Sequence, residues 1–454
     1  MSNKISSILN LIWQARWYAG LGCGWTFSLI MPHFQTNPTS YILFLDMLLV
    51  LLLFISLNHI QKLMNKFVKI TCLLLVFGGF FISYLVSITL DSKYYDLWSH
   101  LGSGTMKLRS EIVTFGDLAH LTSAAKCNIP ITVGENICDP WGRAFNQNPQ
   151  VVKFFRFFGF TNLQMIGLIS TFTFMIIIFL GIKLLKLRTL GIYLFLAMPP
   201  VILAVDRGNE ILTISLIIVG YYFLEKEAQL LQFMGAIFLL LAACFKLWPV
   251  FIVVALLFTS WFRLKFSAKL VLGGALLYWI INSSHVFQML QATQRGSSFG
   301  ASFGLSLLFR NGIDSIRFIL LFVFTLGMFI FLVRAGRSRL ESFISSTRGM
   351  QALRRIAPFM FAYSAIWVSG DSFMYRMVVF IPIILILSSF YYMDFALSNF
   401  LIVAILVTAL TSRLPIAIAV SGALAIYFTY ILFFIFWRFV TSPDADSALV
   451  KKSI

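Results

Sequence analysis

Apolar runs close to the roughly 20 residues that a helix needs to cross a bilayer recur along the whole of this 454-residue chain. The composition agrees, because 59% of the residues are hydrophobic and only 11% are charged, a balance that soluble domains do not show. We therefore predict an all-α, polytopic integral membrane protein with about 11–14 transmembrane helices and one large external loop. The expected spans are 41–57, 70–90, 162–182, 189–205, 209–224, 229–245, 247–262, 269–282, 315–333, 356–369, 376–393, 397–411 and 414–437.

Residues 1–454 are expected to form a single membrane domain. Residues 1–40 form either an interfacial segment or an additional span, because Arg16 interrupts an apolar stretch whose tryptophans suit the membrane interface. No cleaved signal peptide is evident there, since a short apolar core followed by a small-residue cleavage site is lacking. Residues 91–160 are expected to form the external loop, with an amphipathic helix at each end, lying on the membrane and covering a site.

Positive charge divides the connecting loops into two groups when the expected spans are alternated across the bilayer. One side collects Lys and Arg almost without acids, and we interpret it as cytoplasmic. Its cations are Lys62, Lys66, Lys69, Lys183, Lys186, Arg188, Arg263, Lys265, Lys269, Arg334, Arg337, Arg339, Arg348, Arg354 and Arg355. The net charge of +18 therefore reflects topology and contact with anionic membrane lipids, and no nucleic-acid partner is expected.

The densest polar stretch lies between two apolar runs, on the external side, and reads Asp206-Arg207-Gly208-Asn209-Glu210. Asp206 is suited to cap the helix expected at 209–224, with Glu210 in its first turn. Capping leaves Arg207 unexplained, because a cation at a helix N-terminus opposes the helix dipole. Arg207 therefore needs an anionic partner, which is either one of these two acids or a bound phosphate.

Lys246 precedes Trp248 and Pro249 at a membrane depth that matches that of Arg207. A lysine in this position commonly extends its ammonium group to the interface, but together with Arg207 it would hold a phosphate.

Two later external segments also combine small residues, hydroxyl groups and a cation. The segment 299–306 is followed by Arg310, and the segment 370–376 contains Asp371, Tyr375 and Arg376. Taken alone, each is consistent with an ordinary interfacial loop whose arginine reaches the interface.

Asp117 follows Gly116 in the external loop, immediately before a helical pattern. It either caps that helix or, as a carboxylate beside a water-poor cavity, acts as a general base. Cys127 and Cys138 share this loop, and in an oxidising exterior they either form a disulfide or remain two unpaired thiols. A metal site is not expected, because no second cysteine pair or histidine cluster accompanies them.

Three elements in this order and spacing resemble the polyprenol-phosphate-mannose-dependent mannosyltransferases of glycosyltransferase family 87, which belong to the GT-C superfamily. They are Gly116-Asp117, Arg207-Gly208-Asn209 and Lys246-Leu247-Trp248-Pro249, and the similarity covers the chain from about Asp91 onward. The resemblance implies a GT-C-like membrane hexosyltransferase that inverts the anomeric centre and needs no cofactor or metal. It implies transfer of a mannose-like sugar from a polyprenyl-phosphate donor to a glycolipid or glycan acceptor, on the external or periplasmic face of a membrane such as the bacterial inner membrane.

The same resemblance, carried over residue by residue, implies roles for the external polar groups. Asp117 matches the family's general base, and Arg207 and Lys246 match cations near the donor phosphate. Arg310 and Arg376, as further phosphate ligands, and Tyr375, as a supporting residue, are weaker matches. Asp206, Asn209, Glu210 and Asp371 are also expected to support the site, but Glu210 has no counterpart in the family pattern. The chain departs from the family pattern because two spans, 41–57 and 70–90, are expected before the loop.

Two other functions remain open at this stage. A lipid-linked sugar flippase or transporter should carry polar residues along a route across the bilayer. However, Asp46 is the clear acid inside an expected span, and no internal repeat is evident. A polysaccharide polymerase or ligase would share the large external loop, but its donor would be a lipid pyrophosphate.

Overall fold

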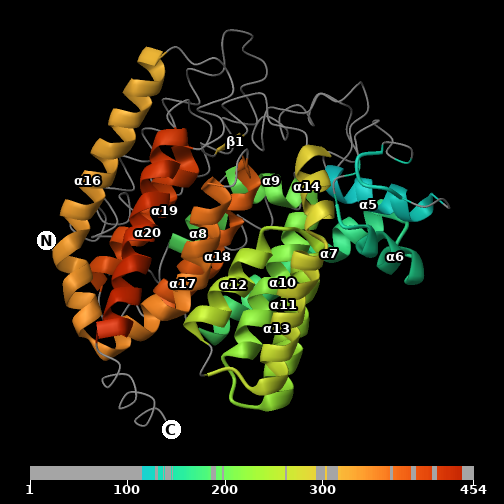
Figure 1. Ribbon diagram of the computed structural model, residues 1–454, viewed down its shortest axis with the longest axis horizontal. Coiled ribbons are helices and arrows are strands. Elements are labelled where there is room, and N and C mark those ends of the chain that lie inside the picture. Colours follow the sequence, from blue (N-terminus) through green and yellow to red (C-terminus); the bar gives the residue numbers. More distant parts are fainter. Residues whose placement is uncertain are drawn as a thin grey trace, which may run out of the picture.

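The computed structural model describes residues 115–127, 131–135, 138, 145, 147–185, 191–196, 199–260, 263–292, 302–303, 315–368, 372–389, 395–411 and 417–441. Within these ranges the chain is mostly helical, as predicted, and its elements run from α5 to α20 (Figure 1). Strands β1 (Ser302–Phe303) and β2 (Ser372–Phe373) form a short antiparallel pair. The expected spans 41–57 and 70–90, and the segment 1–40, lie outside the described residues.

Hydropathy placed several helices accurately. The helices whose two ends together differ by at most four residues from an expected span are α7 (Leu163–Leu184), α10 (Asn209–Leu224), α11 (Gln229–Phe245), α13 (Phe266–Ile281) and α19 (Phe395–Thr411). Both ends of α10 (Gly208 and Glu225) and of α13 (Lys265 and Asn282) adjoin a polar or turn-forming residue, so the apolar run and the helix end close together there.

Other helices differ from the expected spans at their ends. The bounds are α12 (Pro249–Thr259), α16 (Ser315–Ser345), α17 (Thr347–Val368) and α20 (Ala417–Thr441). Helix α16 continues through Arg334, Arg337 and Arg339, because charged residues with long unbranched side chains are good helix formers. Hydropathy therefore located the apolar part of this helix and missed its polar end.

Two expected spans are interrupted. The run at 189–205 divides into α8 (Gly191–Leu196) and α9 (Pro199–Arg207), because Pro199 disfavours helical geometry in the residue before it and suits the first turn of a new helix. The run at 376–393 begins as the 3-10 helix η2 (Met374–Val379) and continues as α18 (Phe380–Ser389). Helix α9 ends at Arg207, directly before the Gly208 turn.

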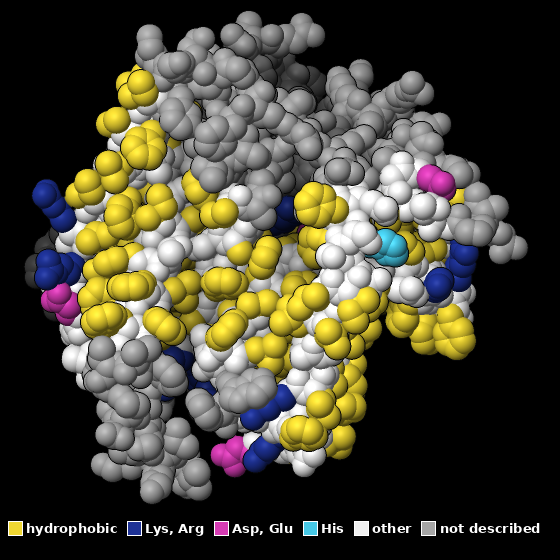
Figure 2. All heavy atoms as spheres, in the orientation of Figure 1, with side chains coloured by type: hydrophobic (Ala, Val, Ile, Leu, Met, Phe, Trp, Pro, Cys, Tyr) yellow, Lys and Arg dark blue, Asp and Glu magenta, His cyan; other side chains and the backbone are white. Residues whose placement is uncertain are grey.

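Among the described residues, three helices are long and apolar enough to cross a membrane, at Leu163–Leu184, Ile319–Ser345 and Ile418–Trp437. Helix α13 and the following α14 (Ser283–Ala292) are bent by 69° and provide a fourth if they form one broken span. Large apolar side chains are exposed along α7, α13 and α16, and Figure 2 shows them covering much of the visible face. These faces are suited to lipid contact.

The buried core has two parts. The larger part fills the space among α10, α12, α17, α18 and α20. The smaller part lies under α5 (Gly116–Lys126) and α6 (Pro149–Phe157), which come from the external loop and pack on each other, with α5 also resting on α7 and α9. We call α5 and α6 the cap. Its position beside the start of α10 brings loop residues next to the bundle (Figure 1).

The far end of α10 carries a second group of charges. Glu225 is the C-cap residue at this end. Its carboxylate forms ion pairs with Arg263 at 3.1 Å and with Arg355 at 2.8 Å. Arg263, between α12 and α13, and Arg355, within α17, are both among the cations that the charge pattern assigned to one side. Because α10 has 16 residues, this end lies about 24 Å from the first turn of the helix.

Two features hold the cap together. Cys127 and Cys138 form a disulfide that ties the end of α5 to the segment before α6. Arg156 of α6 donates hydrogen bonds to the carbonyls of Ala124, Ala125 and Cys127, which belong to the last turn of α5 and its C-cap. A cation at this position satisfies carbonyls that a helix end leaves unpaired and complements the helix dipole.

We expect Arg156→Met to lower the free energy of unfolding by about 2 kcal/mol, since a hydrogen bond from a charged donor contributes about 1.5–3 kcal/mol. Thermal unfolding of the protein in lipid nanodiscs measures the effect. Lys153→Met is the matched control, because Lys153 is exposed on the same helix and the substitution removes the same charge. Equal stability of the two variants would contradict the role given to Arg156.

Candidate functional site

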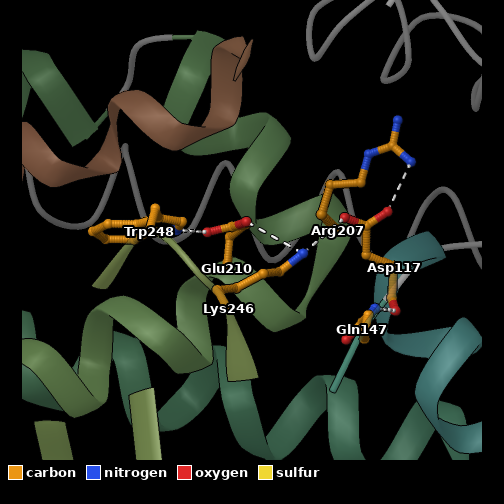
Figure 3. A network of polar contacts seen from close by, with 6 residues as sticks. All are labelled: Asp117, Gln147, Arg207, Glu210, Lys246 and Trp248. Atoms are coloured by element: carbon orange, nitrogen blue, oxygen red, sulfur yellow. Dashed lines mark hydrogen bonds and ion pairs between the residues drawn. The ribbon is translucent and has the colours of Figure 1, made fainter. Parts of the chain in front are cut away.

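Four helix ends meet beside the cap, and each brings one charged side chain (Figure 3). Asp117 lies in the first turn of α5 and Glu210 in the first turn of α10, whereas Arg207 ends α9 and Lys246 is the C-cap of α11. Both acids therefore sit at helix N-termini and both cations at helix C-termini. Every charge in this group complements the dipole of its own helix.

The turn from α9 to α10 corrects two sequence predictions. Gly208, not Asp206, is the N-cap of α10, and Asp206 instead lies within the last turn of α9. Gly208 has a φ of 77°, a backbone conformation that favours glycine. Arg207 consequently stands at the end of one helix, where the dipole stabilises a cation, and not at the start of the next.

Lys246 owes its position to the break between α11 and α12. Its backbone is extended, with φ −141° and ψ 150°, and its N–H donates to the carbonyl of Ala242. Pro249 then starts α12, where the missing N–H of proline removes no helical hydrogen bond. The K-x-x-P sequence thus ends one helix and begins another.

The four side chains form one continuous network, which we call the charge network. Asp117 Oδ1 lies 3.4 Å from Arg207 Nη1, and Asp117 Oδ2 lies 3.6 Å from Lys246 Nζ. Lys246 Nζ also lies 3.4 Å from Glu210 Oε1, so it bridges the two carboxylates. Trp248 Nε1 donates a hydrogen bond of 3.1 Å to the other oxygen of Glu210.

The network is largely withdrawn from solvent. The exposed fractions of the side chains are 0% for Glu210, 5% for Arg207, 14% for Lys246 and 16% for Asp117. Removing an ion from water costs several kcal/mol in a protein, whereas an ion pair at this range gains about 4 kcal/mol at an effective dielectric constant of about 20. The two contributions nearly cancel, so stability alone does not account for these charges.

The expectation that Asp117 caps the helix behind it is wrong. Helix α5 begins at Gly116, its N-cap is Phe115, and no side chain caps it. The Asp117 carboxylate points instead toward Arg207 and Lys246, while Gln147 Nε2 donates to the Asp117 carbonyl oxygen at 3.3 Å (Figure 3). The Asp117 carboxylate is therefore engaged in ion pairs and does not cap α5.

Close approach of α5 to the bundle requires two glycines. Phe115 has a left-handed φ of 63°, which is strained for a bulky residue, and its ring is 2% exposed. A Cβ on Gly167 of α7 would lie 2.1 Å from that ring, and a Cβ on Gly208 would lie 3.1 Å from Leu118 and 3.2 Å from Phe115. These glycines therefore form the slot that brings Asp117 to Arg207.

Other predicted site residues are placed in part. Arg376 is half-buried in η2, which packs against α9 and α10, the helices of Arg207 and Glu210. The β1–β2 pairing, with Ser302 opposite Phe373, joins the segments 299–306 and 370–376 side by side. Arg310 and Asp371 lie outside the described residues, as do the side chains of Asp206, Asn209 and Tyr375.

Three residues that contact or position the network were missed at the level of sequence. Trp248 was noted only as a neighbour of Lys246, although a tryptophan N–H beside a buried acid is a natural donor. Gln147 lies among other polar residues of the loop and belongs to no recognisable motif. Gly167 lies in an ordinary apolar run, and nothing in the sequence links it to Phe115, 52 positions earlier (167 − 115).

Among the residues that the structure describes, no three His, Cys, Asp or Glu side chains are grouped closely enough to share a metal ion. The expectation that the protein uses no metal and no cofactor stays a prediction.

In the comparisons with known proteins, no protein-family model, no curated protein and no solved structure matches the chain. The resemblance to glycosyltransferase family 87 stays a prediction that rests on the three short sequence motifs.

Gly167→Ala should force the Phe115 ring out of its slot and lower the free energy of unfolding by about 1–3 kcal/mol, the usual cost of overpacking. Thermal unfolding in nanodiscs measures the loss. Gly274→Ala is the matched control, because a Cβ at this position of α13 meets nothing within 4 Å. The slot would be refuted if Gly167→Ala were as stable as Gly274→Ala.

Proposed function

We propose that the protein is an integral membrane hexosyltransferase of the GT-C type, which transfers a mannose-like sugar from a polyprenyl-phosphate donor to an acceptor hydroxyl. The observation that carries this proposal is the convergence of Asp117, Arg207 and Lys246 in one network. Asp117 and Arg207 are separated by 90 residues, yet they are two of the three elements on which the family resemblance rests. If the likeness of these short motifs were due to chance, there would be no reason for Asp117 and Arg207 to be in contact.

The proposed reaction divides the network into a base and a phosphate site. Asp117 takes the proton from the acceptor hydroxyl, whose oxygen forms a bond to the anomeric carbon of the sugar. The bond from that carbon to the phosphate oxygen breaks, and its electron pair stays on the polyprenyl phosphate. Arg207 and Lys246 stabilise the added negative charge on the leaving phosphate, with inversion at the anomeric carbon.

The donor's chemistry fits two cations better than one. Arg207 offers a planar guanidinium that can bind two phosphate oxygens, and Lys246 offers a compact point charge. Arg376, on a helix packed against α9 and α10, is a further candidate ligand, and Arg310 is proposed from sequence alone. Asp206, Asn209, Asp371 and Tyr375 keep their proposed supporting roles on the same basis.

The membrane arrangement is part of the proposal. The chain would cross the bilayer about 11–14 times, with the shorter apolar helices α10, α11 and α12 completing spans inside the bundle. The charge network lies at the opposite end of α10 from Arg263 and Arg355, and the positive-inside rule places those cations in the cytoplasm. The network then faces outward, toward the periplasm if the membrane is a bacterial inner membrane.

One observation favours transfer over transport. Among the described residues, the Arg, Lys, Asp and Glu side chains that are fully buried are Arg207 and Glu210. Both lie at the turn from α9 to α10, at one end of the bundle. A transporter would instead place such groups along a path across the bilayer.

We expect Asp117→Asn to reduce sugar transfer by about 10²- to 10⁴-fold, the usual contribution of a general base. Arg207→Ala should reduce transfer at least tenfold, because the leaving phosphate loses a charged ligand. The assay follows transfer from a panel of polyprenyl-phosphate monosaccharides to glycan acceptors, by purified protein in nanodiscs.

Arg263→Ala serves as the control, because it removes an arginine at the far end of α10 and should leave transfer unchanged. Thermal unfolding of each variant separates loss of chemistry from loss of fold. Full activity of Asp117→Asn, or inactivity of the wild-type protein with every donor, would overturn the proposal.

A further inference from the structure

Two adjacent amide side chains, Gln147 and Asn148, lie directly before α6, and Gln147 contacts the backbone of Asp117. They are only 3% and 2% exposed. Gln147 Nε2 donates to the Asp117 carbonyl oxygen at 3.3 Å, as Figure 3 shows, and Asn148 is the N-cap of α6. Neither amide belongs to the motifs that indicated a transferase.

The hydrogen bonds that these amides make fix which end of each is oxygen and which is nitrogen. The partner of Gln147 is a carbonyl, which can only accept, so the nitrogen of Gln147 must face it. The partners of the Asn148 oxygen are the N–H of Gln150 at 3.0 Å and the hydroxyl of Tyr278 at 3.3 Å. Because the backbone N–H can only donate, the oxygen of Asn148 must face it.

The other half of each amide is unused. Gln147 Oε1 and Asn148 Nδ2 are buried and have no hydrogen-bond partner within the part of the chain that the structure describes. A buried polar atom without a partner costs about 1–3 kcal/mol, and two neighbouring residues carry this cost. In a native protein such an unpaired group is explained by strain, by a bound water or ion, or by a functional role.

The chemistry of the unused atoms selects a class of ligand. Gln147 offers an acceptor and Asn148 offers a donor, and a hydroxyl group both donates and accepts. A phosphate would lie against the Gln147 oxygen, which is also an acceptor, and this contact is unfavourable. A cation would lie against the Asn148 nitrogen, which is also a donor, and this contact is equally unfavourable. A neutral compound with several hydroxyl groups satisfies both atoms.

We propose that Gln147 and Asn148 form a subsite for the acceptor sugar, in which they bind its hydroxyl groups next to Asp117. This assignment rests on the proposed function and adds the residues that hold the second substrate. The Tyr278 hydroxyl of α13 donates a hydrogen bond to the Asn148 side chain. The subsite therefore lies between the cap and the bundle.

The test is a matched pair of cap-preserving substitutions. Asn148→Ser keeps an N-cap for α6, because serine caps about as well as asparagine, but it removes the amide donor. Asn162→Ser makes the same change at the N-cap of α7, where the Asn162 oxygen accepts from the N–H of Met165 in an exposed setting. Both variants should unfold at the wild-type temperature.

Binding is measured without any donor, by ligand-observed NMR titration of methyl hexopyranosides against protein in nanodiscs. Sugar-headed detergents are avoided because their head groups would compete. Wild type and Asn162→Ser should bind the same glycoside, and Asn148→Ser should bind it about five- to tenfold more weakly, the effect of one lost hydrogen bond. A deoxy analogue that lacks the paired hydroxyl should lose the same factor with wild type and nothing further with Asn148→Ser.

Equal binding by Asn148→Ser and Asn162→Ser would overturn the subsite and leave the two amides as groups paired only by water. Absence of glycoside binding by wild type would overturn it as well. Neither outcome touches the proposed function, which depends on transfer from the lipid donor. Conversely, glycoside binding that depends on Asn148 in a protein without transfer activity would support the subsite and refute the hexosyltransferase.

Discussion

Burial of four charges at the meeting of four helix ends is the constraint on which the rest of this structure depends. In a chain so poor in charge, a buried carboxylate or cation is tolerable only with an opposite charge and a favourable dipole close by. Asp117, Glu210, Arg207 and Lys246 supply both for one another. The arrangement requires α9 and α11 to end where α5 and α10 begin. Gly208 fixes the end of α9, and Pro249 fixes the end of α11. The residues that favour helix ends therefore occur where the ion pairs also require those ends.

The cap determines whether this network is complete. Asp117 is its only member from the external loop, and it reaches Arg207 because Phe115 fits against Gly167 and Gly208. The disulfide and Arg156 hold α5 to α6 at the other end of the same short helix. The cap is thus fastened at both ends of α5. A base that must meet a substrate within a few tenths of an ångström benefits from such support, because rigid surroundings preserve reactive geometry.

Sequence reasoning succeeded where information is local. Apolar runs gave both ends of α10 and α11, and membrane depth grouped Arg207 with Lys246 before any contact was known. It failed where a backbone break or a distant contact decides the outcome. Asp206 has the chemistry of a helix cap, but the preceding helix extends through Arg207 and Gly208 takes the cap position. Glu210 was one of three partners considered for Arg207, along with Asp206 and a bound phosphate, whereas its described contacts are with Lys246 and Trp248. The packing of Phe115 on Gly167 leaves no periodic signal, since it joins a loop to a helix through shape alone.

The two carboxylates of the network differ in a way that bears on the proposed reaction. Glu210 is fully buried, held by Lys246 and by the Trp248 N–H, so it is a fixed counter-charge. Asp117 is more exposed, and its contacts with Arg207 and Lys246, at 3.4 and 3.6 Å, are longer than a strong charge-assisted hydrogen bond. A donor phosphate that binds the two cations would compete with Asp117 and not with Glu210. Donor binding would then release the Asp117 carboxylate toward the acceptor, so that the base becomes available only when the sugar to be transferred is in place.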